Sequence, residues 1–248
     1  MNAIDIMEVD MLQVYMGEDY IINDKIKIFQ PTMGQIVKYG EKEYYSMVHT
    51  LCSIPSDLKS QLFDMGIDYE SISDFQLFMI LSPTMGVDRT EILFGDLDFS
   101  ELRPFQNPQN DQIVLANKET GVIIDELIYE RIVNYLRKVH GLKKKVEHAA
   151  NEFTKRFLID EDRQKIAFNK TQPYQSFLLP IISAVKARQG YSLDYVKSMR
   201  LFEFMDEVNR LQVIHNADHL LSGMYSGMMD TSKINKNDLN WMKELDKD

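Results

Sequence analysis

The chain has 248 residues, a formal net charge of -10 and a pI near 5.0. A chain of this length can bury a sizeable core in one large domain or in two smaller ones. Its acidic balance argues against broad, non-specific binding of nucleic acid, which depends on Lys and Arg neutralising phosphates. Cys52 is the only cysteine, so an intramolecular disulfide and zinc sites built from several thiolates are excluded.

The composition also indicates where the protein works. The first twenty residues contain several acidic side chains and neither Lys nor Arg, the opposite of a secretory signal. No apolar run approaches the roughly 20 residues that a membrane helix needs. We therefore expect a cytoplasmic protein that does not contact a membrane.

The N-terminal third predicts a hairpin followed by short helices. Residues 20–22 and 25–29 are β-prone runs that flank a turn at 23–24. Thr32 and Gln35 have the spacing of a capping box, which predicts a helix that Gly40 interrupts and that resumes over 41–53. Two further helices are predicted over 57–65, with Ser56 as N-cap, and over 74–81.

Residues 86–124 predict a small antiparallel sheet inserted between helices. Its β-prone runs lie at 92–94, 112–116 and 122–124, separated by Pro104, Pro108 and a turn over 117–121. Asp125 then caps an amphipathic helix that extends to residue 140.

The remaining chain is predicted to be almost entirely helical. The lysines at 143–145 mark the best boundary, and helices are expected over 147–157, 161–169, 176–189 and 198–228, with Pro180 kinking or delaying the third. The fold class is therefore mainly α (α+β): a helical bundle with an N-terminal hairpin and a small inserted antiparallel sheet. Two subdomains are expected, 1–142 and 143–248.

The last long helix changes its apolar face partway along. Either it breaks near 212–216 or it passes its apolar face from one partner to another, and we favour the second interpretation. The second partner is either part of this chain or an external protein; in the latter case Leu221, Met224, Tyr225 and Met228 are the partner-binding residues. The two sets, each at helical spacing, are Leu201, Phe204, Val208 and Leu211, then Ile214, Ala217, Leu221, Met224 and Met228.

His215 and His219 lie one turn apart on this helix, with Asp218 between them, so both imidazoles could reach one metal ion. The zinc-protease pattern needs a glutamate where Asn216 stands, and a third ligand would have to come from elsewhere. The alternative is a hydrogen-bonded pair. We predict neither a metal nor another cofactor.

Ser46, His49 and Cys52 fall on one predicted helix and form a candidate nucleophile group. A reactive cysteine needs its thiolate stabilised, commonly at a helix N-terminus, whereas Cys52 lies near a helix C-terminus. A packed thiol is the preferred interpretation.

Asp96 and Asp98, followed by Ser100, resemble the opening of a calcium loop. The positions that require glycine and a bidentate glutamate hold Glu101 and Asn107 instead. Solvated turn carboxylates are the preferred interpretation.

The span Arg137 to Arg156 is rich in Lys and Arg, but few aromatic residues are interleaved with them. Neither a G-x-x-x-x-G-K-[ST] loop nor a G-x-G-x-x-G motif is present. The basic side chains are expected to form a solvated face, and nucleic-acid binding is not predicted.

Two segments carry a resemblance to a known family. One runs from Ile26 through Pro31-Thr32-Met33-Gly34 to Tyr45, and the other spans Asp218 to Gly227 together with Trp241. Both resemble segments of tail assembly chaperone-type proteins of bacteriophages and prophages of Gram-positive bacteria. The resemblance implies a non-enzymatic factor, in the host bacterial cytoplasm, that shields the tape measure protein while the tail tube polymerises. The inserted sheet and the chain length depart from the small helical chaperones of this family.

The leading hypothesis is therefore a non-enzymatic phage tail assembly protein that binds a helical partner, such as the tape measure protein, and that is also able to self-associate. A minor virion structural protein is the nearest alternative. The alternative from another class is a metal-dependent hydrolase or nuclease that uses His215, His219, Asp96 and Asp98.

Overall fold

The helices begin where the sequence offers a side-chain oxygen to the free N–H groups of a first turn. Thr32 and Gln35 form the expected capping box, Asp125 accepts from the backbone of Ile128, and Asn151 accepts from that of Thr154. The computed structural model describes residues 9–107, 111–227 and 234–245. Over these residues the protein is mainly α with two small antiparallel sheets, so the expected fold class is confirmed.

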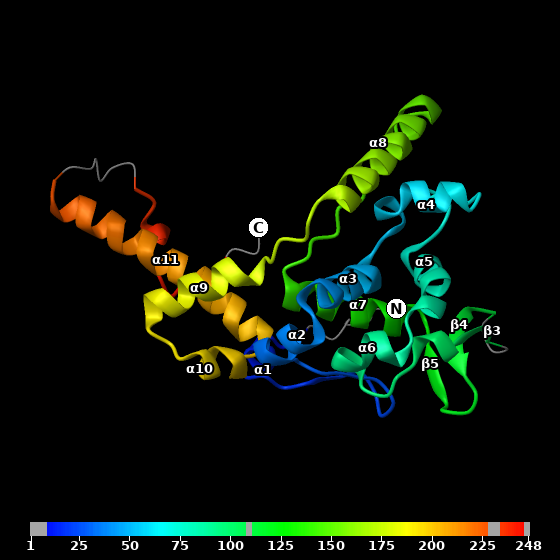
Figure 1. Cartoon of the computed structure of the whole chain (residues 1–248), viewed down its shortest axis with the longest axis horizontal. Coiled ribbons are helices and arrows are strands. Elements are labelled where there is room, and N and C mark those ends of the chain that lie inside the picture. Colours follow the sequence, from blue (N-terminus) through cyan, green and yellow to red (C-terminus); the bar gives the residue numbers. More distant parts are fainter. Residues whose placement is uncertain (1–8, 108–110, 228–233, 246–248) are drawn as a thin grey trace, which may run out of the picture.

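The elements follow one another in this order (Figure 1). The helices are α1 (Met11–Tyr15), α2 (Met33–Tyr39), α3 (Glu41–Cys52), α4 (Lys59–Asp64), α5 (Asp74–Leu81), α6 (Val87–Phe94), α7 (Glu126–His140), α8 (Glu152–Thr171), α9 (Leu178–Gln189), α10 (Leu193–Ser198) and α11 (Leu201–Tyr225). Short 3-10 helices are η1 (Pro55–Asp57), η2 (Ser82–Thr84), η3 (Phe99–Glu101) and η5 (Lys236–Leu239). The strands are β1 (Tyr20–Ile21), β2 (Lys27–Ile28), β3 (Arg103–Gln106), β4 (Ile113–Asn117) and β5 (Val122–Ile124).

The N-terminal hairpin forms as predicted. β1 and β2 pair antiparallel, with Tyr20 opposite Ile28, and the Asn23 side chain accepts from the backbone N–H groups of Lys25 and Ile26 in the turn. Ile26 and Ile28 are fully buried, so the hairpin contributes one face to the core.

The inserted sheet is smaller than the sequence suggested. Its strand order is β3-β4-β5, all antiparallel, and it starts at Arg103. The expected strand at 92–94 is wrong: these residues are the last turn of α6, where Thr90, Leu93 and Phe94 are buried at helical spacing. Pro104, taken as a separator, lies within β3, an edge strand that tolerates proline because half of its N–H groups need no ladder partner.

Two other helix starts differ from the prediction. Ser56 is not an N-cap: it lies within η1, and α4 begins only at Lys59, because Pro55 favours a tight 3-10 turn there. Residues 147–157 and 161–169 do not form two helices: α8 is a single helix that begins after Asn151. No glycine or proline interrupts residues 152–171, so the charged run inside them leaves the helix intact.

The C-terminal helices follow the prediction more closely. Pro180 is the third residue of α9, where a missing N–H costs no intrahelical bond, so it delays the helix instead of kinking it. α11 is one unbroken helix, which excludes the break considered near 212–216. Met228 lies outside the described residues. α10, which the sequence did not suggest, is capped by Ser192.

The main core lies between α7, α3 and the hairpin. Ile132 and Leu136 of α7 are fully buried, as is Tyr44 of α3, whose hydroxyl lies 2.8 Å from Nε2 of His140. Nδ1 of His140 lies 2.7 Å from the Leu136 carbonyl, which can only accept, so the Tyr44 hydroxyl donates to Nε2. Burial lowers the pKa of His140 to about 4, so the ring is a neutral link between the two helices.

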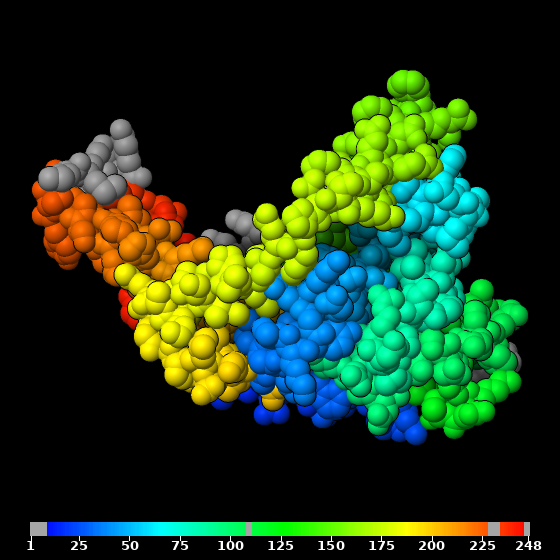
Figure 2. Space-filling model, viewed as in Figure 1, coloured from blue at the N-terminus to red at the C-terminus, as the bar shows by residue number. Residues whose placement is uncertain are grey.

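Two extensions leave this body in different directions (Figure 1). α8 projects beside α4, and α9, α10 and α11 extend on the opposite side of the molecule. Figure 2 shows an open hollow between the two extensions.

A carboxylate holds the start of α9, which also buries Leu178 and Val185 in the main core. Glu41 Oε1 accepts from the N–H groups of Phe177 (2.7 Å) and Leu178 (2.8 Å), and Oε2 accepts from the Ser176 hydroxyl. Burial raises the pKa of Glu41, but the hydrogen bonds from Ser176, Leu178 and Phe177 lower it by more, so the net pKa is lowered. The charge also suits the positive end of the α9 dipole.

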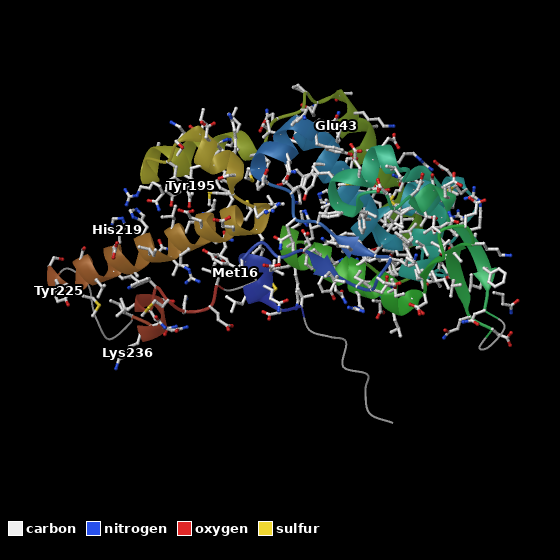
Figure 3. The ribbon with its side chains drawn as sticks, turned by 90° about the horizontal axis from the view of Figure 1, so that it is seen from below. Met16, Glu43, Tyr195, His219, Tyr225 and Lys236 are labelled. Carbon is white, nitrogen blue, oxygen red and sulfur yellow. The ribbon has the colours of Figure 1, made fainter. Side chains whose placement is uncertain are left out.

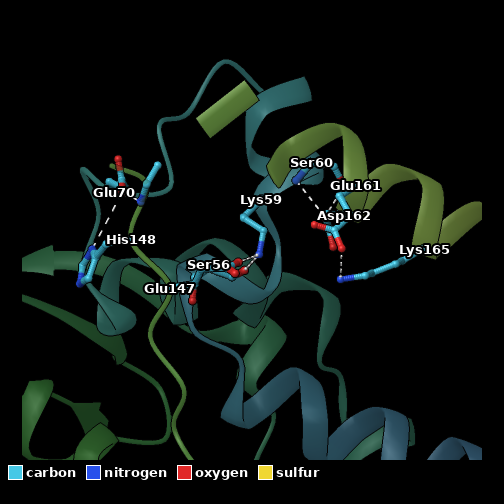
Figure 4. A network of polar contacts seen from close by, with 10 residues as sticks. Ser56, Lys59, Ser60, Glu70, Glu147, His148, Glu161, Asp162 and Lys165 are labelled. Carbon is cyan, nitrogen blue, oxygen red and sulfur yellow. Dashed lines mark hydrogen bonds and ion pairs between the residues drawn. The ribbon is translucent and has the colours of Figure 1, made fainter. Parts of the chain in front are cut away.

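α8 is held to α4 largely by polar contacts (Figure 4). Asp162 accepts from both the backbone and the hydroxyl of Ser60, at 3.1 and 2.6 Å. The Lys155 ammonium lies 2.5 Å from Asp68 and 3.0 Å from Glu70. The contact also has an apolar cluster, whose buried members are Leu62, Tyr69, Leu77 and Ile159.

We expect Glu41→Ala to detach the start of α9, because three donors lose their acceptor. The loss should be about 1 to 2 kcal/mol, or roughly 2 to 6 °C in Tm at pH 7. Since the folded pKa of Glu41 is lowered, its contribution is present above the unfolded pKa and disappears as pH falls through the folded value.

Calorimetry at pH 7 and pH 3 measures the Tm of the natural chain and of the Glu41→Ala variant. Glu43→Ala, in the same turn of α3, is the control, and its Tm should fall by less at pH 7. A Glu41→Ala deficit that stays constant down to pH 3 would contradict the assignment.

We expect Lys155→Met to loosen α8, because the substitution leaves Asp68 and Glu70 without their cation. Amide hydrogen exchange of α8 should accelerate by about tenfold or more. Lys165→Met is the matched control on the same helix, since Lys165 makes only an exposed i,i+4 pair with Glu161. Equal exchange in the two variants would show that the Lys155 contacts do not hold the helix.

Candidate protein-binding surface

The first half of α11 packs on the body. Leu201 and Phe204 are buried in the main core, and Val208 and Leu211 pack against it while partly exposed. This is the first apolar face predicted from the sequence. α1 and α7 contact α11 and cover this half.

The second half of α11 passes to a different neighbour, the C-terminal segment of residues 234–245. η5 contacts α11, and the Arg210 guanidinium donates to the carbonyls of Trp241 (2.8 Å) and Lys243 (2.7 Å). Ala217 of the second apolar set is fully buried. α11 therefore changes its neighbour along its length, as the favoured interpretation predicted. Residues 234–245 of the same chain contact its second half.

The end of α11 remains open. Tyr225 is 89% exposed at the free end of the helix (Figure 3), while Leu221 and Met224 are half-buried. Met228, the fourth residue predicted to bind a partner, lies outside the described residues. A large aromatic side chain in water at a helix end is a candidate anchor for a protein partner.

Sequence reasoning missed a second exposed apolar set on α8. Phe153, Phe157 and Phe168 are all exposed, and their spacing of 4 and 11 residues places them on one face. That face is opposite Ile159, the buried residue that meets α4. The helical spacing of the three phenylalanines was visible in the sequence, but splitting α8 into two helices obscured it.

α9 adds further exposed apolar side chains. Phe177, the N-cap residue of α9, and Leu179 in its first turn are about as exposed as those of α8. α8 and α11 border the hollow in Figure 2, with α9 between them. The exposed apolar side chains of the three helices are Phe153, Phe157, Phe168, Phe177, Leu179 and Tyr225.

Cys52 is a packed thiol, which confirms the preferred interpretation of the sequence. It is buried near the end of α3, and burial raises the pKa of its thiol to about 12, although the nearby Arg137 lowers it. Arg137 donates to the carbonyl of Cys52 and not to the sulfur. A thiol of this kind has very little thiolate at neutral pH.

Asp96 and Asp98 lie in the turn between α6 and η3, not in a strand. Oδ1 of Asp98 accepts from the backbone and the hydroxyl of Ser100, so this carboxylate is a helix cap. Asp96 borders a groove that Arg200 and Lys38 also line, and Asp98 is not part of it.

The structure brings His215 and His219 together. Their Nε2 atoms are 2.9 Å apart on exposed rings that meet edge to face. Within the described part of the chain, no third His, Cys, Asp or Glu joins them in a metal-binding group, so Asp96, Asp98 and Asp218 do not complete one.

Part of the basic span pairs with other parts of the chain. Lys144 pairs with Asp74 of α5, Lys155 pairs with Asp68 and Glu70 in the loop between α4 and α5, and Arg137 of α7 donates to the Cys52 carbonyl of α3. The two lysines therefore connect α8 and its preceding loop to residues 68–74.

A family model described as the second domain of YomV matches residues 170–246, and YomV is a protein of a Bacillus prophage region. This part of the chain is similar to a phage-associated domain. The matched residues run from the end of α8 through α9, α10 and α11 to the C-terminal segment. No curated protein and no solved structure matches the chain. Among the described helices, none has both the length and the apolar character needed to cross a membrane.

The buried state of Cys52 predicts slow alkylation. At pH 8 iodoacetamide should label the native protein more than about 100-fold slower than an exposed thiol, because little thiolate is present. A Cys52→Ala, Ser226→Cys variant supplies that exposed thiol for comparison. Mass spectrometry follows the reaction, and equal rates would contradict the packed thiol.

Proposed function

We propose that this phage-associated protein is a non-enzymatic factor of tail assembly, which binds a helical protein such as the tape measure protein. The main observation behind this proposal is that α8, α9 and α11, which border an open hollow, carry exposed apolar side chains. Tyr225 is the most exposed of them, at 89%. Exposed aromatic residues of this kind are typical anchors of protein interfaces.

The similarity to the YomV second domain supports the phage context, since it covers the whole of α9, α10 and α11. The resemblance of the hairpin region and of the Asp218–Gly227 segment to tail assembly chaperones supports the finer role. A helical tape measure protein exposes long apolar faces before the tube encloses it. A chaperone with apolar helices on both sides of a hollow suits such a client.

The candidate reactive groups support a non-enzymatic role. Cys52 is a poor nucleophile because it is buried, and Asp98 caps a helix. The hydrolase alternative needs Asp96 and Asp98 beside His215 and His219, but these aspartates belong to a turn after α6 and the histidines to α11.

Co-expression with the tape measure protein of the same phage tests the proposal. The protein should keep the tape measure protein soluble, and the two should copurify. Tyr225→Asp should weaken the complex by more than about tenfold, because it places a charge in an apolar contact.

Ile123→Asp, an exposed apolar residue of β5, is the matched control and should leave binding unchanged. Circular dichroism should show that both variants fold. A tape measure protein that aggregates equally with and without this chain would refute the chaperone role. Recovery of the chain in stoichiometric amounts from purified virions would favour a minor virion structural protein instead.

A further inference from the structure

We propose that His215 and His219 form a bidentate chelating site for a late first-row divalent metal ion of the Zn²⁺, Ni²⁺ and Cu²⁺ class. The inference is independent of the partner proposed above. It rests on the convergence of two imidazole nitrogens on a rigid, exposed turn of α11.

The two ring nitrogens already lie near the spacing that a chelated ion needs. The two residues are separated by one turn of a continuous helix, and their Nε2 atoms are 2.9 Å apart. Two Zn–N bonds of about 2.0 to 2.1 Å at a tetrahedral angle hold their nitrogens roughly 3.4 Å apart. A small rotation of the exposed rings opens the pair to that spacing, without any change of backbone.

The ring tautomers are also compatible with a metal. In the Nε2 to Nε2 hydrogen bond, one ring donates and the other accepts, so the lone pair of the accepting nitrogen becomes available to an ion once that bond opens. The other ring does so when its proton moves through solvent to Nδ1, the usual tautomer of a metal-bound imidazole. The cost is one exposed hydrogen bond, replaced by two bonds to the metal.

The surroundings leave room for the remaining ligands. His219 lines an open cavity between α11 and the C-terminal segment, together with Asn216, Asp238 and Lys243. Lys243 pairs with Asp238 at 3.3 Å, so the charges at this wall partly cancel. Both rings are exposed, and water can complete a coordination shell that has two protein ligands.

A bound ion would connect two turns of α11 close to the C-terminal segment. Because the two ligands are already on one rigid helix, little conformational entropy is lost on binding. The ion would therefore stiffen the outer half of α11, the part that carries Tyr225.

Isothermal titration of the full chain with Zn²⁺ at pH 7.5 tests the site, with His215→Gln and His219→Gln as variants. Each substitution turns a two-point chelate into a single contact, so affinity should fall by about 100-fold. His148→Gln is the matched control, since His148 is exposed and lies beside Glu70, away from α11. It should bind Zn²⁺ as the natural chain does.

Imidazole resonances in NMR give a second readout, because the chain has five histidines and only two should shift with the first equivalent of Zn²⁺. Both positions are exposed, so the variants should fold, and circular dichroism checks that. The proposal is overturned if either variant keeps the original affinity, if His148→Gln loses as much, or if other histidines shift first.

Discussion

The position of the outer helices depends on a short backbone contact between two distant parts of the chain. The Met33 N–H donates to the Met199 carbonyl at 2.9 Å, and the Leu201 N–H donates to the Pro31 carbonyl at 3.3 Å. The Arg200 side chain also donates to the Gln30 carbonyl. Met33, Met199 and Leu201 are buried beside these bonds, so α11 starts from a fixed point on the core. This anchor fixes the start of α11 and thereby helps to set the direction in which the helix leaves the core.

Beside such anchors, polar side chains help to attach the two extensions. α9 is held at its start by Glu41 and also buries Leu178 and Val185 in the main core. α8 relies more on polar contacts, through Lys155 and Asp162, and Ile159 is its one buried residue. These attachments leave other apolar side chains in solvent, namely Phe153, Phe157 and Phe168 of α8 and Phe177 and Leu179 at the start of α9. Exposed apolar side chains of this kind form a candidate binding surface.

The sequence predicted those elements whose signals are local. Thr32 with Gln35 and Asp125 mark helix starts because a capping side chain and the backbone N–H that donates to it are three residues apart, and Gly141 ends α7 in a left-handed conformation that glycine adopts easily. The errors came where tertiary contacts decide. Residues 92–94 are β-prone, but burial of Leu93 and Phe94 against the core makes them helical. The role of Lys144 and Lys155 as ion-pair partners of acidic residues in 68–74 could not be read from charge density, since those acidic residues lie far away in the sequence.

The candidate binding surface on α11 was partly predictable, because part of its signal is local in the sequence. A change of apolar phase within one helix is a local pattern, and it correctly indicated two successive neighbours for α11. It could not tell that the second neighbour is residues 234–245, whose only large aromatic, Trp241, is itself about half exposed. Because the segment is anchored by two bonds from Arg210 to backbone carbonyls, its sequence carries no signal of the contact. Among the described residues Tyr225 stays exposed, so the surface that we propose for a protein partner lies at the end of the helix and not along the whole second face.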